Sequence, residues 1–176
     1  MEVNFLTKSA FLQEEKSKGE LKEELDELEI QLFRMQNNIK EIAKKSEVIS
    51  IDQTPNEEWV VVYADRDKDT WQLMLHSCKR AYQGNWHSAL QAEVKDDSTI
   101  HIAAIKGEQN KGYGSVLMNH LKEIAKEENV QYITGDLVQR DYGHVDRLQY
   151  FYEKHNFDVT VDHVEKCGEI IWNDDE

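Results

Sequence analysis

The stretch Gln109-Asn110-Lys111-Gly112-Tyr113-Gly114 decides the fold of this chain, because it joins two segments of different character. Residues 99–106 before it form a β-branched run typical of a strand. Residues 112–128 after it place apolar side chains at helical spacing. A strand that passes through a glycine-containing loop into a helix presents backbone N–H groups at the positive end of the helix dipole. The sequence therefore predicts a site for an anion, such as a diphosphate, at this turn.

Individual residues of the turn fit that prediction. Gly112 and Gly114 have no Cβ atom, so we expect a bulky diphosphate to approach the main chain closely there. Lys111 would add a positive charge and Ser115 a hydroxyl group.

The rest of the chain after residue 47 alternates between strands and helices. Polar turns at 65–69 and 96–98 indicate two hairpins. We expect strands at 59–64, 70–76, 88–95 and 99–106, a helix at 112–128, a strand at 131–138, a helix at 145–155, and strands at 158–164 and 169–172. This order predicts an α+β domain over 48–176, with a mixed, mostly antiparallel sheet flanked by helices.

Residues 1–47 have the composition of a helical arm, being rich in Glu, Lys, Leu and Gln. Ser17-Lys18-Gly19-Glu20 fits a capping box, so a long helix is expected to begin there. From that point apolar residues recur at alternating spacings of four and three, the heptad pattern of a coiled coil: Leu21, Leu25, Leu28, Leu32, Met35, Ile39 and Ile42. The stripe predicts either a homodimer through this helix or packing of the helix on its own domain.

Composition restricts the class of protein. A formal net charge of -14 repels phosphate backbones, so we expect no nucleic-acid partner. No window approaches the ~18 apolar residues of a membrane span, and Met1-Glu2-Val3-Asn4 does not resemble the start of a signal peptide. Cys78 and Cys167 lack the spacing of a zinc site, so we expect no metal and a reduced, cytoplasmic protein.

Two motifs together resemble the GNAT (GCN5-related N-acetyltransferase) superfamily. The turn at 109–114 is similar to the Gln/Arg-x-x-Gly-x-Gly/Ala motif of that family, and Phe151-Tyr152-Glu153-Lys154-His155-Asn156-Phe157 is similar to its Phe-Tyr-x-x-x-Gly-Phe run. The resemblance covers residues 86–172 and implies an acetyl-CoA-dependent N-acetyltransferase. It implies a cofactor site along the strand and turn, made of Ile102, Ala103, Ala104, Ile105, Gln109, Asn110, Lys111, Gly112, Tyr113, Gly114 and Ser115.

The resemblance also implies catalytic roles. Tyr152 corresponds to the tyrosine that protonates the departing CoA thiolate, and His101 lies in the strand where some relatives carry a catalytic histidine. An imidazole accepts protons near neutral pH, so His101 is our candidate general base. Glu93, Glu108 and Asp136 remain alternatives for that role.

The chain departs from the family pattern in several places. Asn156 replaces the usual glycine, which a left-handed turn can tolerate. A larger departure lies in the first half of the domain. Residues 65–70 are too few to hold the helix pair that usually follows the first strand and builds the acceptor pocket. The expected acceptor is a small-molecule or peptide amine whose identity the sequence leaves open. The alternative is a non-catalytic CoA-binding or scaffold domain in a coiled-coil interaction protein.

Overall fold

The computed structural model describes residues 16–174, so residues 1–15 of the predicted arm lie outside it. The chain forms two compact units that divide between Phe33 and Arg34. The predicted boundary after residue 47 stays a prediction. The elements, in chain order, are α1 (Lys18–Ile42), β1 (Glu47–Gln53), β2 (Trp59–Arg66), β3 (Thr70–Ser77), β4 (Ser88–Asp96), β5 (Thr99–Gly107), α2 (Tyr113–Glu127), β6 (Tyr132–Leu137), the 3-10 helix η1 (Gln139–His144), α3 (Val145–Lys154), β7 (Asp158–Asp162) and β8 (Cys167–Asn173).

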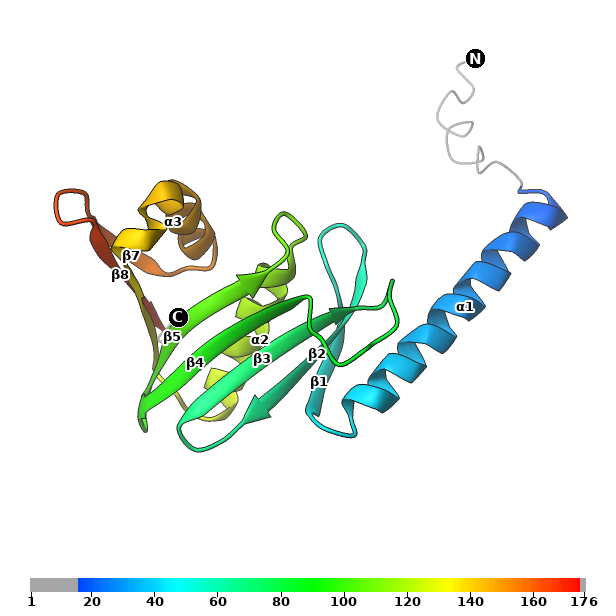
Figure 1. The fold of residues 1–176 in the computed structure, drawn as a ribbon, viewed down its shortest axis with the longest axis horizontal. Coiled ribbons are helices and arrows are strands. Elements are labelled where there is room, and N and C mark those ends of the chain that lie inside the picture. The colour runs from blue at the N-terminus through cyan, green and yellow to red at the C-terminus, as the bar shows by residue number, and fades with distance from the viewer. Residues whose placement is uncertain (1–15, 175–176) are drawn as a thin grey trace, which may run out of the picture. The chain divides into compact units, whose positions relative to one another are not determined.

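All eight strands form one sheet, in the order β1-β2-β3-β4-β5-β6-β8-β7 (Figure 1). Neighbouring strands are antiparallel except β5 and β6, which are parallel and are joined through α2. This confirms the predicted α+β class with a mixed, mostly antiparallel, GNAT-like sheet. The predicted hairpins β2–β3 and β4–β5 are present, and no helix lies between β2 and β3. The sequence reading missed β1 and η1.

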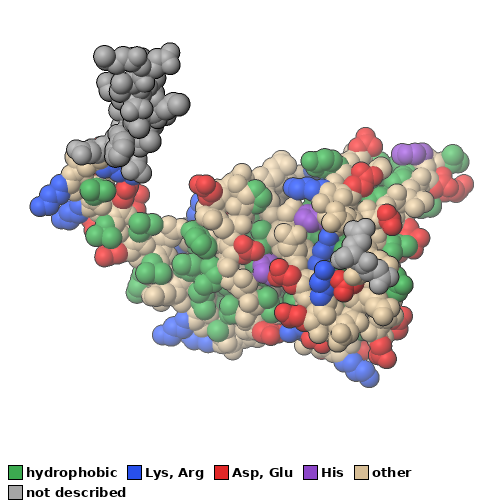
Figure 2. Space-filling model, turned by 180° about the vertical axis from the view of Figure 1, so that it is seen from behind, with side chains coloured by type: hydrophobic (Ala, Val, Ile, Leu, Met, Phe, Trp, Pro, Cys, Tyr) green, Lys and Arg blue, Asp and Glu red, His purple; other side chains and the backbone are tan. Residues whose placement is uncertain are grey.

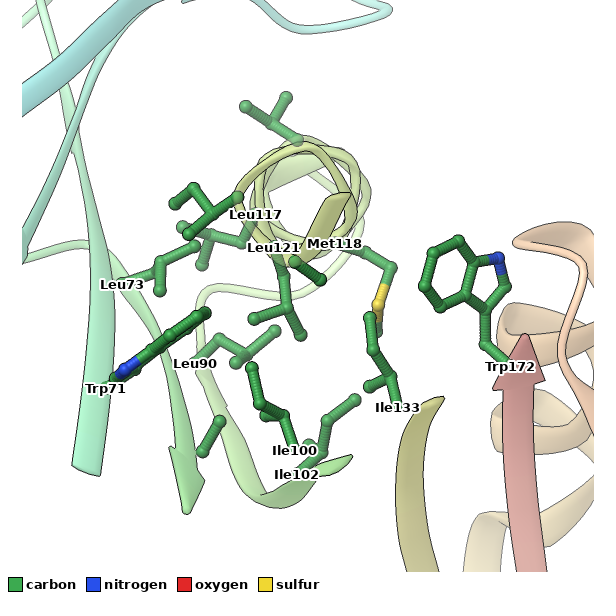
Figure 3. Packing of buried hydrophobic residues seen from close by; sticks show 14 of the residues in the cluster. Trp71, Leu73, Leu90, Ile100, Ile102, Leu117, Met118, Leu121, Ile133 and Trp172 are labelled. Carbon is green, nitrogen blue, oxygen red and sulfur yellow. The ribbon is translucent and has the colours of Figure 1, made fainter. Parts of the chain in front are cut away.

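One face of the sheet packs against α2. Leu117, Met118 and Leu121 point from this helix into the main core (Figure 3). Their partners come from five strands and include Leu73, Leu90, Ile100, Ile102, Ile133 and Trp172. The helical spacing places these apolar side chains on one face of α2, and that face packs in the core. Truncation of a fully buried leucine here to alanine would lower the free energy of unfolding by about 2–5 kcal/mol. Tyr113, the first residue of α2, belongs to the same core.

The opposite face of the sheet carries a second, smaller core. Ile42 at the end of α1 packs with Val61, Tyr63 and Met74, and Met35 and Ile39 flank this cluster. Because β2 is covered on both faces, its residues 60–64 are all buried. This explains the unbroken apolar run in β2, where a half-exposed strand would alternate. The last three heptad positions of the arm therefore pack on the chain's own sheet.

The first part of α1 has the predicted start. The Ser17 backbone N–H donates to the Glu20 carboxylate at 2.6 Å, and the Glu20 N–H donates to Ser17 Oγ at 3.3 Å, which confirms the capping box. Apolar side chains of this part are more than half exposed, namely Leu21, Leu25, Leu28, Ile30, Leu32 and Phe33. The single heptad stripe of the sequence thus divides into an exposed portion and a portion buried in the second unit.

Charged side chains are interspersed on the surface. On the face shown in Figure 2, acidic side chains are scattered and basic ones occur in small groups between them. Within residues 16–174 no helix is long and apolar enough to cross a membrane.

Candidate functional site

The parallel strands β5 and β6 are hydrogen-bonded to each other over only part of their length. They are paired from Thr99↔Tyr132 to Ile102↔Gly135 and not beyond. β5 then continues to Gly107 beside β4, whereas β6 continues to Leu137 beside β8. A β-bulge leaves Ala103 as the extra residue of β5 opposite β4. Since bulges bend a strand and increase its twist, this one accounts for the separation at that point. The two parallel strands therefore splay apart beyond Ile102 and Gly135.

A cavity of about 740 Å³ lies in this gap and extends to the turn and to α3. Its lining includes ten of the eleven predicted cofactor residues, namely Ile102, Ala103, Ala104, Ile105, Gln109, Asn110, Gly112, Tyr113, Gly114 and Ser115. Lys111, the eleventh, is exposed and does not line the cavity. A volume of this size is in the range of small-molecule and cofactor sites.

The start of α2 has the predicted bare amides. Gly112 is the N-cap residue, with a φ of 78°, and no side chain caps the first turn. The first α-helical hydrogen bond runs from the Val116 N–H to the Gly112 carbonyl at 3.2 Å, so the preceding N–H groups have no α-helical partner. Asn110, with a φ of 59°, gives the loop a second left-handed residue. In general, a loop of this kind at a helix start presents N–H groups that suit an anion. Binding of an anion here stays a prediction.

The structure adds a packing reason for one of the two glycines. A Cβ atom on Gly112 would lie 2.7 Å from Cδ of Pro55, and one on Gly114 would lie 3.5 Å from the Phe151 ring. A side chain on Gly112 would thus collide with Pro55, whereas one on Gly114 would make only an ordinary contact. Both glycines line the cavity, and the close approach of a diphosphate to them stays a prediction. Gly112 is also needed for its positive φ, which other residues adopt at a cost.

Basic side chains that the sequence reading missed surround the cavity: Lys106, Arg140, Arg147 and Lys154. Arg147 Nη1 donates to Gln109 Oε1 at 2.7 Å, so α3 is tied to the anion-binding turn. Arg147 and Lys154 are spaced four and three residues from Phe151, on the same helical face. This spacing can be read from the sequence and was the signal that could have identified Arg147 and Lys154 as site residues. Three acids, Glu108, Asp136 and Asp141, also line the cavity.

Tyr152 lies in the wall of the cavity and is almost fully buried, with 8% of its surface exposed. Its ring packs against Phe151 and Phe157 at centroid distances of 5.3 and 5.5 Å. Burial, and then the nearby Asp141 carboxylate, raises the pKa of Tyr152 to about 12. The phenol therefore stays protonated at neutral pH, as a proton donor must.

His101 lies just before the point where the strands part. Because Ile100 and Ile102 face the core under α2, the side chain of His101 is on the other face of the sheet. Its Nδ1 is 3.0 Å from Thr134 Oγ1, and its Nε2 is 3.5 Å from Asp136 Oδ2. His101 itself does not line the cavity, but Asp136 does. Of the alternative bases, Glu108 also lines the cavity, whereas Glu93 is paired with Lys95 at 2.5 Å.

Ser115, in the first turn of α2, is held by a buried histidine. Its Oγ is 3.0 Å from Nε2 of His155, which follows α3. Burial, followed by the charges of Lys122 and Lys154, lowers the pKa of His155 to about 4, so this imidazole is neutral at pH 7. The neighbouring Asn156 has a φ of 59°, which confirms the predicted left-handed residue in place of the family's usual glycine.

A second cavity of about 480 Å³ adjoins the first, since Gly107 and Glu108 line both. Its other walls include His76, His87, Arg80 and Trp86. Residues 16–174 contain no group of three or more His, Cys, Asp or Glu side chains placed to hold a metal ion.

The chain matches no model of a known protein family. It is 47% identical over 164 residues to the protein of Bacillus subtilis (strain 168) described as uncharacterized protein YocC, a match that covers 93% of this chain and 99% of that protein. Two mutant structures of the cAMP-binding acyltransferase from Mycobacterium smegmatis superpose with TM-scores of 0.54 and 0.53 at 13% identity. They cover 77% and 81% of this chain, which spans 50% and 52% of theirs. At this identity the likeness concerns the fold alone.

Proposed function

Because the chain belongs to the family of the Bacillus subtilis protein YocC and has a GNAT-like fold, we propose from its site that it transfers an acetyl group from acetyl-CoA to a primary amine. The observation that carries the proposal is the uncapped start of α2 at one end of a cavity between parted strands. A cofactor with a diphosphate and a long, narrow arm fits this arrangement.

The residues present suit each part of acetyl-CoA. The amides that follow Gly112 would bind the diphosphate, and Arg147 and Lys154 would neutralise its charge. The edge of β5 from Ala103 to Ile105 lacks a β6 partner, so its backbone groups can hydrogen-bond an extended arm. When bound, the cofactor supplies the acetyl group in the activated form of a thioester.

The proposed roles in proton transfer fall to two side chains. Tyr152 holds a proton on its hydroxyl oxygen and gives it to the leaving group. His101 would accept the proton of the amine through Asp136, which lines the cavity and lies 3.5 Å from Nε2. A backbone N–H at the bulge, where β5 has no β6 partner, would be the oxyanion stabiliser.

Calorimetric titration with acetyl-CoA tests the proposal directly. We expect saturable binding, and we expect Arg147→Ala to weaken it about tenfold through loss of a charge-assisted contact. Arg34→Ala is the matched control, because Arg34 bonds the Lys79 carbonyl and does not line the cavity. Absence of saturable binding by the wild-type protein at millimolar acetyl-CoA would remove the enzymatic proposal.

The exposed stripe of α1 favours a second role. Leu21, Leu25, Leu28 and Leu32 keep heptad spacing and are each more than half exposed. Ile30 and Phe33 lie beside these positions and widen the exposed apolar surface that pairing with a second copy would cover. We propose that the chain is a homodimer through this stripe. If acetyl-CoA does not bind, this contact would be the principal function of the protein.

A further inference from the structure

The turn between β1 and β2 contains a buried carboxylate that the proposed chemistry does not use. Glu58 closes this turn, because its carbonyl accepts from the Thr54 N–H at 2.9 Å and its own N–H donates to Thr54 Oγ1 at 3.2 Å. Only 7% of Glu58 is exposed. A buried carboxylate is costly unless donors satisfy it, so its partners indicate why it is there.

Three donors converge on this carboxylate, two from the end of β3 and the residues after it and one from the start of α2. The Tyr113 hydroxyl donates to Glu58 Oε1 at 2.8 Å, and the Ser77 hydroxyl donates to the same oxygen. Lys79 Nζ lies 3.3 Å from Oε2. Burial by itself would raise the pKa of Glu58, but the hydrogen bonds from Ser77, Tyr113 and Lys79 outweigh it and hold the pKa below its ordinary value. Glu58 is therefore ionised at neutral pH, and Tyr113 donates to a negative charge.

The partner that matters for the site is Tyr113. It is the first residue of α2, so its backbone N–H is one of the uncapped amides. Only 2% of Tyr113 is exposed, and its hydroxyl group reaches Glu58. The same β1–β2 turn supplies Pro55, which fills the space where a side chain on Gly112 would lie. One turn thus fixes two consecutive residues of the anion site, one by packing and one by a charge-assisted hydrogen bond.

We propose that Glu58 is a positioning residue for diphosphate binding, acting through the Tyr113 hydroxyl to hold the first amides of α2 in place. The inference rests on the proposed function, because the diphosphate is that of acetyl-CoA. Glu58 does not touch the cavity itself. If the start of α2 is displaced, its N–H groups no longer point at one site. The affinity contributed by the diphosphate then falls, whereas the affinity contributed by the rest of the ligand does not.

The test compares acetyl-CoA with S-acetylpantetheine, which lacks the diphosphate and the 3′-phosphoadenosine attached to it. Affinities for acetyl-CoA and for S-acetylpantetheine are measured by NMR titration with wild type, Glu58→Ala and Tyr113→Phe. We expect Glu58→Ala to weaken acetyl-CoA binding about tenfold or more, Tyr113→Phe to weaken it several-fold, and both to leave S-acetylpantetheine within about twofold of wild type. In the double variant the loss should be smaller than the product of the two single losses.

Asn38→Ala is the matched control. Asn38 is also buried, at 2% exposed, and bonds the Arg80 carbonyl and the Tyr82 N–H, without a bond to Glu58 or Tyr113. It should lower stability without changing the ratio of the two affinities. Equal weakening of both ligands by Glu58→Ala, or none, would overturn the inference while wild type still binds acetyl-CoA. If Glu58→Ala does not fold, Tyr113→Phe decides by the same ratio. Failure of wild type to bind acetyl-CoA would instead defeat the proposed function.

Discussion

Replacement of Gly112 by alanine offers a sharp test of how the anion-binding turn is built. Two independent features of this position oppose any side chain. Its φ of 78° lies in the left-handed region, and an ideal Cβ would come within 2.7 Å of Cδ of Pro55. That separation is far below van der Waals contact, so either Pro55 or the start of α2 must move.

The magnitude of the effect follows from these two terms. A non-glycine residue in the left-handed region costs about 1–2 kcal/mol. Forcing an extra methyl group into a filled space costs about 1–3 kcal/mol. Gly112→Ala should therefore lower the free energy of unfolding by about 2–5 kcal/mol, which corresponds to a fall in Tm of roughly 10 °C for a chain of this size.

Urea unfolding followed by circular dichroism measures the loss. Gly143→Ala is the matched control, because no atom lies within 4 Å of the added Cβ and Gly143 has no positive φ. It should leave stability unchanged or raise it by up to about 1 kcal/mol. The double variant Gly112→Ala/Pro55→Ala should recover the packing term and retain the backbone term. A Gly112→Ala loss below about 0.5 kcal/mol would refute both terms.

Three further predictions concern the chemistry, the pH dependence and the assembly. Tyr152→Phe should slow acetyl transfer about 100-fold, as expected for removal of a general acid, while calorimetry shows an unchanged affinity for acetyl-CoA; an unaltered rate would exclude the tyrosine as proton donor. Burial, followed by the charges of Lys122 and Lys154, lowers the pKa of His155 to about 4, so the folded chain resists a proton that the unfolded chain takes up near pH 6.5. The free energy of unfolding should consequently fall by at most about 3 kcal/mol as the pH drops from about 6.5 to 4. The difference between wild-type and His155→Gln unfolding curves should isolate the contribution of His155 to this fall. A difference that does not vary with pH would contradict the prediction. Leu28→Asp should convert the expected dimer to a monomer in light scattering, whereas a wild-type monomer at high micromolar concentration would disprove pairing.

The sequence predicted those features whose causes are local. The capping box at Ser17 depends on residues three positions apart, and the hairpins depend on short polar turns between β-branched runs. The loop into α2 could be recognised because a glycine and a change of period mark a helix start. β1 carries the β-branched signal of a strand and was within reach of the same reasoning.

Tertiary structure decided what depends on residues distant in the chain. Heptad spacing is identical along α1, yet Met35, Ile39 and Ile42 meet the sheet while Leu21 to Leu32 remain exposed, because periodicity specifies a face and not its partner.

The same limit applies to the site. Glu58 and Tyr113 lie 55 positions apart, and Gln109 and Arg147 lie 38 apart, so only the pairing of strands and the packing of helices brings each pair within hydrogen-bonding distance. Local sequence patterns therefore predicted the uncapped amides at the turn. Only the folded chain brings Glu58 to Tyr113, and Arg147 to Gln109. Such long-range contacts leave no regular spacing in a sequence.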